Sequence, residues 1–130
     1  MAFSSTGTVH RSTVTGRRGM IASGHPLASL AGLRILMQGG NAIDAAVATA
    51  AALNVVEPYM SGIGGVGYMN IYSARSNEHK ILDYVGLTPA ATDIALYDED
   101  KRDRGPLSHL VPGACGGWLE AIARYGNLSP

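Results

Sequence analysis

Charged residues are scarce in this chain, and their scarcity limits what the chain can bind. Only 15% of its 130 residues are Asp, Glu, Lys or Arg, against roughly 25% in typical soluble domains. The 10 basic and 10 acidic residues cancel to a formal net charge of zero. Because no excess of positive charge is available to attract phosphates, we expect neither nucleic acid nor an anionic membrane as a partner.

Cysteine and long apolar runs are also lacking. Cys115 is the only cysteine, which excludes an internal disulfide and any metal site built from several cysteines. The first twenty residues contain no apolar run of the kind a secretory signal needs. The longest apolar stretch, residues 42–56, is interrupted by Asp44, Thr49 and Asn54 and falls short of a membrane span. We therefore expect a soluble, cytoplasmic chain.

The apolar content that is present comes mostly from small and aliphatic side chains. Hydrophobic residues make up 46% of the chain, but aromatic residues only 6%. A chain with so much alanine and so little charge has more apolar surface than one small domain can hide. We therefore expect part of its surface to contact a partner, and the isolated chain to associate.

Periodicity and turn residues predict an α+β chain. Residues 1–18 are rich in Ser, Thr, Gly and Arg without periodicity, which indicates a flexible N-terminal tail, whereas 19–130 form one structural unit. Within this unit, three segments have the pattern of helices and three that of strands. The helices are expected at 26–37, 42–54 and 114–125, and the strands at 19–24, 68–72 and 79–85, the last two as a β-hairpin.

The second predicted helix, residues 42–54, is apolar on all sides, so we expect it to be buried over most of its surface. Asn41 precedes it and is a favourable N-cap residue. Asp44 follows three residues later, where a carboxylate is costly unless it is hydrogen-bonded. We expect Asp44 to cap the start of the helix through backbone N–H groups.

None of the motifs in the sequence predicts a catalytic, metal or cofactor site within this chain. Residues 62–67 match G-x-G-x-x-G, but a helix precedes them and a strand follows, the reverse of a dinucleotide loop, so we expect close backbone packing instead. Cys115 would need a histidine base to act as a nucleophile, and His109 lies near it in sequence. Since free cysteine is usually buried, we expect a structural thiol. The histidines, His10, His25, His79 and His109, lack metal-binding spacing.

Four stretches together resemble the γ-glutamyltranspeptidase family. They are GMIASGHPLAS at 19–29, GLRILMQGGNAIDAAVATAAALNVVEP at 32–58, SGIGGVGYMNIY at 61–72 and LVPGACGGWLEAIARYGNLS at 110–129. Their order and spacing match the start of the family's large subunit. The resemblance covers about residues 19–130, and the run from His25 to Gly67 is highly specific.

The resemblance implies a partial αββα sandwich of the N-terminal-nucleophile hydrolase type, with buried helices and a β-hairpin. In that family a precursor cleaves itself, and the new N-terminal threonine of the small subunit is the nucleophile, with its α-amine as the base. Residues 19–130 would be the N-terminal part of the large subunit, inactive alone and without a cofactor. The implied partners are the rest of the large subunit, the small catalytic subunit, a small-molecule amide substrate and further copies in an oligomer.

One departure from the family's pattern concerns the substrate. Glutamyl-transferring members have Asp-Phe-Arg-Glu where this sequence has Asp83-Tyr84-Val85-Gly86, and their arginine holds the α-carboxylate of the glutamyl group. Val85 takes that substrate-binding position, and an isopropyl group cannot grip a carboxylate as a guanidinium does. The resemblance therefore implies an amidohydrolase or acylase. The alternatives are a true γ-glutamyl transferase or hydrolase, and a non-catalytic truncated paralogue with only an association role.

Overall fold

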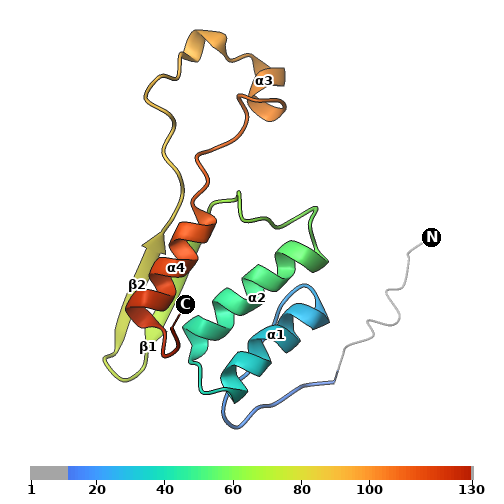
Figure 1. Ribbon diagram of the computed structural model, residues 1–130, viewed down its shortest axis with the longest axis vertical. Coiled ribbons are helices and arrows are strands. Elements are labelled where there is room, and N and C mark those ends of the chain that lie inside the picture. Colours follow the sequence, from blue (N-terminus) through green and yellow to red (C-terminus); the bar gives the residue numbers. More distant parts are fainter. Residues whose placement is uncertain (1–11, 130) are drawn as a thin grey trace, which may run out of the picture.

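The structure, a computed structural model, describes residues 12–129 apart from the side chains of Glu99 and Arg102. Figure 1 shows a body formed by three helices and a β-hairpin, from which the residues between β2 and α4 project as an arm. The chain is thus α+β, as predicted. The elements are α1 (Pro26–Met37), α2 (Ala42–Val56), β1 (Tyr68–Ser73), β2 (Glu78–Asp83), the 3-10 helix η1 (Ile94–Leu96), α3 (Glu99–Asp103) and α4 (Ala114–Tyr125).

Local sequence signals explain where α1 begins and ends. Pro26 occupies its first position, where a missing N–H costs nothing, and the ring Nδ1 of His25 accepts the N–H of Leu27 at 3.2 Å. Gly39, just beyond the end of the helix, has a φ of 95°, which a residue with a Cβ rarely adopts. The predicted helix is confirmed at both ends.

The start of α2 is a reciprocal capping box, as predicted for Asn41 and Asp44. Oδ1 of Asn41 accepts the N–H of Ile43 at 2.8 Å and that of Asp44 at 3.2 Å. In return, Oδ2 of Asp44 accepts the N–H of Asn41 at 2.8 Å. These bonds satisfy N–H groups that a helix start otherwise leaves without a partner.

Small residues allow α1 and α2 to lie side by side at close range (Figure 1). Gly32 of α1 is buried, and a Cβ built on it would lie 2.2 Å from Oγ1 of Thr49 in α2. The same Thr49 hydroxyl donates to the carbonyl of Ala45 at 2.7 Å, so its polar atom is satisfied inside the contact. Glycine is therefore the only residue type that fits at position 32 without a shift of the helices.

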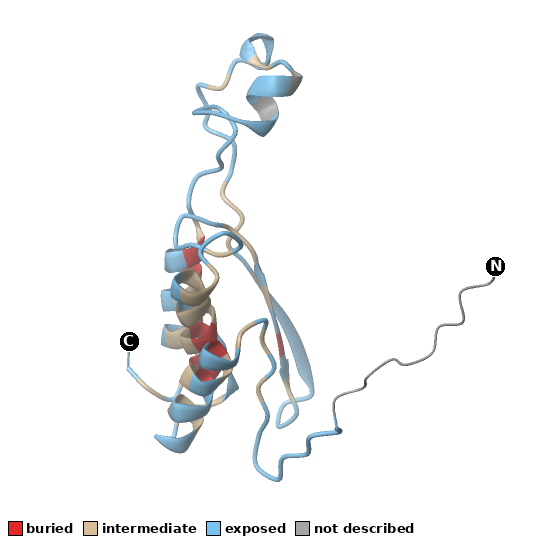
Figure 2. Ribbon diagram, turned by 90° about the vertical axis from the view of Figure 1, so that its right-hand side faces the viewer, coloured by how far each residue is buried: buried red, intermediate tan, exposed pale blue. Residues whose placement is uncertain are grey.

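Helix α2 is less buried than its composition predicted. Its buried residues are Asp44, Ala45, Val47 and Thr49, whereas Val55 is 79% exposed. The reason is that α1 and α4 leave one face of α2 open, where the exposed residues Ala42, Ala46, Ala51 and Val55 recur at four- or five-residue spacing. Figure 2 shows most of the buried residues in the helices and one, Ile71, in a strand of the hairpin, with none among the described residues of the arm.

The predicted hairpin forms, with β1 and β2 antiparallel from the pair Tyr68 and Asp83 to the pair Ser73 and Glu78. Its turn contains Asn77 at a φ of 52°, a conformation that asparagine tolerates well. The second strand was expected to reach residue 85 but ends at Asp83. Beyond Asp83 the pairing continues only through the N–H of Tyr84, because the N–H of Val85 donates to the side chain of Asp83 instead.

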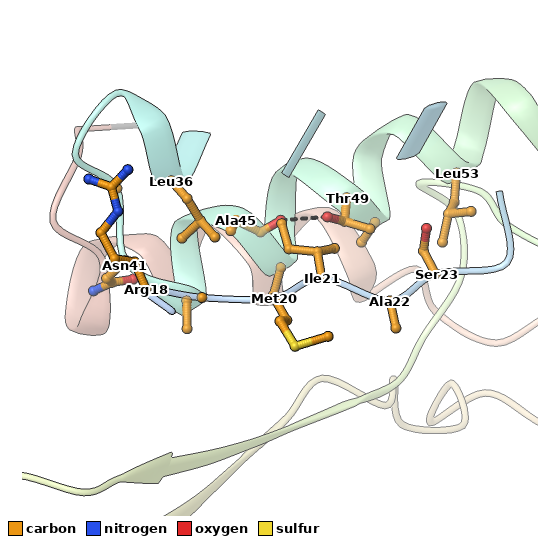
Figure 3. A pocket seen from close by; sticks show the side chains of 15 residues that line it. Arg18, Met20, Ile21, Ala22, Ser23, Leu36, Asn41, Ala45, Thr49 and Leu53 are labelled. Atoms are coloured by element: carbon orange, nitrogen blue, oxygen red, sulfur yellow. Dashed lines mark hydrogen bonds between the residues drawn. The ribbon is translucent and has the colours of Figure 1, made fainter. Parts of the chain in front are cut away.

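The strand predicted at residues 19–24 is not formed as a sheet strand. The segment is extended along α1 and α2, with Ile21 pointing towards the helices and Met20 and Ala22 pointing away (Figure 3). This is the side-chain alternation of a strand. No strand among residues 12–129 pairs with it, because the sheet there consists of β1 and β2 alone.

The N-terminal tail predicted at residues 1–18 lies outside the described residues up to residue 11. Residues 12–18 are exposed and form neither helix nor strand. In the described part of the chain, none of the helices has the length and apolar character needed to traverse a bilayer.

Candidate functional site

Val85, the predicted substrate-binding residue, lies two residues after the end of β2 and is half-buried. Its main-chain N–H donates to Oδ1 of Asp83 at 2.9 Å, which fixes the direction in which the chain leaves the strand. Immediately before it, the N–H of Tyr84 donates to the carbonyl of Gly67 at 3.0 Å, continuing the hairpin pairing past its last ladder residue. The backbone on the N-terminal side of Val85 is therefore held by two hydrogen bonds.

Tyr84 is enclosed by glycines on two elements. A Cβ built on Gly67, just before β1, would lie 3.1 Å from Cε2 of the Tyr84 ring. A Cβ on Gly117 of α4 would lie 2.3 Å from Cγ of the same ring. The ring thus fills a space that exists only because neither position carries a side chain, and it joins α4 to the hairpin.

The two ends of the arm meet beside Val85 in direct backbone contact. A Cβ on Gly86 would lie 2.0 Å from the carbonyl oxygen of Val111, and a Cβ on Gly113 would lie 2.0 Å from the carbonyl oxygen of Tyr84. Neither glycine has a positive φ. Glycine is therefore needed at both positions for space and not for backbone conformation.

The glycine-rich residues 62–67 connect α2 to β1, and two of them, Gly65 and Gly67, contact the same region. The carbonyl of Gly65 accepts the N–H groups of Gly113 at 3.0 Å and Ala114 at 2.9 Å, which anchors the start of α4. Helix precedes and strand follows this segment, so the order that a dinucleotide loop requires is reversed. Close backbone packing in a buried strand was predicted for these glycines, but the close contact at Gly67 is with the ring of Tyr84 and the segment is not a strand. Gly62 and Gly64 face open space.

The chemistry available at Val85 follows from its side chain and its neighbour. Val85 and Gly86 bring neither charge nor a side-chain hydrogen-bonding group, so they suit an uncharged apolar group rather than a carboxylate. Sequence reasoning selected Val85 but missed Val111 and Gly113, which are distant in sequence. The glycines at 86 and 113 could have indicated this contact, since a glycine allows another segment of the same chain to approach closely.

Cys115 was expected to be buried, and the structure corrects this because the thiol is exposed. Helix α4 buries the face that carries Ala114, Gly117 and Ala121, and Cys115 lies off that face. His109 is exposed as well. Since no hydrogen bond joins the two side chains, both of which are described, they do not form a nucleophile–base pair. No group of three or more described His, Cys, Asp or Glu residues could hold a metal ion.

A groove of about 590 Å³ runs between residues 18–23 and α2 (Figure 3). The groove is mostly apolar because its helical wall consists largely of alanine side chains. It brings together no pair of acid–base groups. Sequence reasoning did not predict this groove, since it requires the extended segment to lie along α2 without a neighbouring strand. The alanines of the wall are Ala42, Ala45, Ala46 and Ala50.

The clearly displaced pKa values belong to fully exposed groups in surface pairs, which contribute little to stability. None of these groups is on the residues around Val85. Hydrogen bonds from neighbouring lysines lower the pKa of two carboxyl groups, and a glutamate raises the pKa of one guanidinium group. They are Glu78 beside Lys80 and Ser76, Asp98 beside Lys101, and Arg124 beside Glu120.

Comparison with curated proteins identifies relatives over nearly the whole chain. The Acylase ACY 1 proenzyme of Pseudomonas sp. (strain V22) is 43% identical over 134 residues, which cover 93% of this chain and 24% of that protein. The glutathione hydrolase proenzyme of Bacillus subtilis (strain 168) is 41% identical over 122 residues, covering 88% of this chain and 21% of that protein. This chain thus spans less than a quarter of the length of these relatives.

Solved structures with the same fold include both acylases and transpeptidases. Cephalosporin acylase from Bacillus halodurans superposes with a TM-score of 0.80 at 35% identity, over 98% of this chain and 25% of that one. Helicobacter pylori γ-glutamyltranspeptidase gives a TM-score of 0.80 at 35% identity, over 90% of this chain and 35% of that one. Residues 28–129 match the gamma-glutamyltranspeptidase family itself. The chain therefore belongs to the gamma-glutamyltranspeptidase family.

Proposed function

We propose that this chain forms the acyl-binding side of an N-terminal-nucleophile amidohydrolase or acylase. Its fold would contribute to an αββα sandwich completed by the rest of the parent enzyme. The nucleophile would be a threonine exposed by self-cleavage in that other part. Membership of the family, and relatives that are named acylase and proenzyme, support this proposal.

In the proposed reaction, the threonine hydroxyl attacks the carbonyl carbon of a small amide and its proton passes to the α-amine. The carbon–nitrogen bond breaks as that proton moves to the leaving amine, and an ester between threonine and acyl group remains. Water then attacks the ester and releases the acid. The role proposed for the present residues is to hold the acyl group while these bonds are exchanged.

Overall sequence identity does not decide which acyl group the parent enzyme accepts. The acylase relative is 43% identical and the glutathione hydrolase 41% identical, a difference too small to separate two specificities. The acyl preference is instead set by the few side chains that contact the acyl group.

The observation that carries the acylase proposal is the apolar side chain of Val85. Val85 is half-buried, and the resemblance to glutamyl-transferring members assigns it the position of their carboxylate-binding arginine. A substrate carboxylate brought there would lose its charge-assisted partner, a loss of about 2–5 kcal/mol by analogy with truncated charge pairs. At about 1.4 kcal/mol per tenfold, the enzyme should discriminate against γ-glutamyl donors by about thirtyfold to several thousandfold.

The test uses the parent enzyme with its natural sequence. We would compare kcat/KM for a γ-glutamyl anilide with that for an uncharged acyl anilide of similar size, at several salt concentrations. The proposal expects the uncharged donor to be preferred at every salt concentration. A clear preference for the γ-glutamyl donor that weakens with salt would show that another cation binds the carboxylate, and the acylase assignment would be wrong.

A further inference from the structure

The contacts at the base of the arm are reciprocal. Residues 84 and 86 on one chain segment face residues 113 and 111 on the other, and each segment contributes one glycine and one carbonyl. A Cβ built on Gly86 would lie 2.0 Å from the carbonyl oxygen of Val111. A Cβ built on Gly113 would lie 2.0 Å from the carbonyl oxygen of Tyr84. Distances this short mean that the two backbones approach each other with no room for a side chain at either glycine. We name these four residues the base clamp.

The base clamp contains the residues on either side of Val85. The N–H of Tyr84 donates to the carbonyl of Gly67, the carbonyl of Tyr84 lies close to Gly113, and Gly86 lies close to Val111. The N–H of Val85 itself is bound by Asp83. The main chain of Val85 is therefore fixed from both sides, although its side chain forms none of these contacts.

Crowding at Gly86 is specific to that position and is not shared by every glycine of the region. Gly62 and Gly64 have no heavy atom within 4 Å of a Cβ built on them, and neither has a positive φ. A methyl group would be accepted there. At Gly86 the obstacle is a backbone oxygen, which no change of side-chain rotamer can move away.

We propose that Gly86 is a positioning residue for acyl selectivity, acting through the base clamp to hold residue 85 in the acyl-binding site. This inference rests on the proposed function and adds a determinant that does not touch the acyl group. A methyl group at position 86 must push residues 84–86 away from Val111, and Val85 moves with them. Displacement of a positioning group by about an ångström changes rates by up to a hundredfold. The size of this change differs between acyl groups of different length.

The experiment compares Gly86→Ala with the matched control Gly62→Ala in the parent enzyme. The readout is the ratio of kcat/KM for a short and a long uncharged acyl anilide, because this ratio does not depend on how much of the enzyme is folded. We expect Gly86→Ala to change the ratio by about tenfold or more, and Gly62→Ala to leave it within about twofold of the natural enzyme. If Gly86→Ala lowers both rates equally, Gly86 is merely structural and the proposal is overturned.

Should Gly86→Ala give no folded enzyme, Val111→Gly provides the same measurement. This variant gives the backbone that faces Gly86 more conformational freedom, and it removes a side chain that is already 48% exposed, so it adds no clash. The ratio of kcat/KM for the short and the long acyl anilide must shift again, and an unchanged ratio overturns the proposal. The preference of the natural enzyme between γ-glutamyl and uncharged donors tests the proposed function separately, because that comparison does not involve a variant of Gly86.

Discussion

Gly117 of α4 lies directly against the ring of Tyr84, and a Cβ built on Gly117 would approach Cβ and Cδ1 of that tyrosine to 2.5 Å each. The ring cannot retreat freely, because Gly67 lies against its outer edge and the Tyr84 N–H is bound to the carbonyl of Gly67. This contact joins α4 to the hairpin and positions the residues that lead to Val85.

Gly117→Ala is expected to destabilise the chain by about 1–3 kcal/mol, the usual cost of overpacking a filled site. The matched control is Gly116→Ala, since a Cβ on Gly116 meets nothing within 4 Å. That control should be neutral or stabilising by up to about 1 kcal/mol, because alanine is the better helix former. Urea denaturation at matched protein concentration would measure both. Equal stabilities of the two variants would mean that the ring moves aside easily.

Asp44 links the start of α2 to the end of α4 and is only 5% exposed. Its Oδ2 accepts the N–H of Asn41 at 2.8 Å and the N–H of Asn127 at 2.9 Å. Asp44→Ala should therefore cost about 1–3 kcal/mol, because it leaves backbone donors without their acceptor. Asp93→Ala removes an exposed cap of η1 and should change stability by less than about 0.5 kcal/mol. Denaturation midpoints that fall equally in both variants would contradict this assignment.

An apolar stripe on α1 is expected to make the isolated chain associate. Leu27, Leu30, Leu33 and Met37 recur at three- or four-residue spacing and are 57%, 43%, 44% and 79% exposed. Replacing Leu30 and Met37 by lysine should lower the mass seen by light scattering and the fluorescence of bound ANS.

The control for this experiment adds the same charge elsewhere, through lysine at the exposed residues Thr13 and Gln38. It should leave association unchanged, because the stripe remains intact. A natural chain that is a monodisperse monomer and binds no ANS would refute the expectation.

The elements that sequence reasoning predicted well are those set by neighbouring residues. Pro26 and Gly39 bound α1, and Asn41 with Asp44 caps α2, because each signal acts within one helical turn. Signals from neighbouring residues also predicted the hairpin turn and both ends of α4. The proposed site was reached differently, through a resemblance that assigned Val85 its position.

Features that depend on distant contacts could not be derived in this way. The contact of Gly86 with Val111 exists only because the arm returns to its own base, which no periodicity reveals. Cys115 was expected to be buried on the general behaviour of free cysteine, but its place on α4 leaves it exposed. The segment at 19–24 has the alternation of a strand, but strand formation also requires a neighbour.

The exchange of Val85 for arginine is the most specific prediction for the parent enzyme. Val85→Arg should raise kcat/KM for a γ-glutamyl donor relative to an uncharged one by about tenfold, since a guanidinium can bind the donor's carboxylate in bidentate fashion. The gain should shrink as salt is added, because a half-exposed charge pair is screened. Val85→Gln is the control, as it adds length and hydrogen-bonding capacity without charge, and it should give no salt-dependent gain.

Gly86 should be kept in that experiment, although glutamyl-transferring members have glutamate after the arginine. Gly86 does not have the left-handed conformation that would forbid a side chain, but the carbonyl of Val111 occupies the place of its Cβ at 2.0 Å. Val85→Arg combined with Gly86→Glu should therefore lose the gain of the single variant. If the double variant is instead the better γ-glutamyl enzyme, the arm can move away from residue 86 and the base clamp does not fix the position of residue 85.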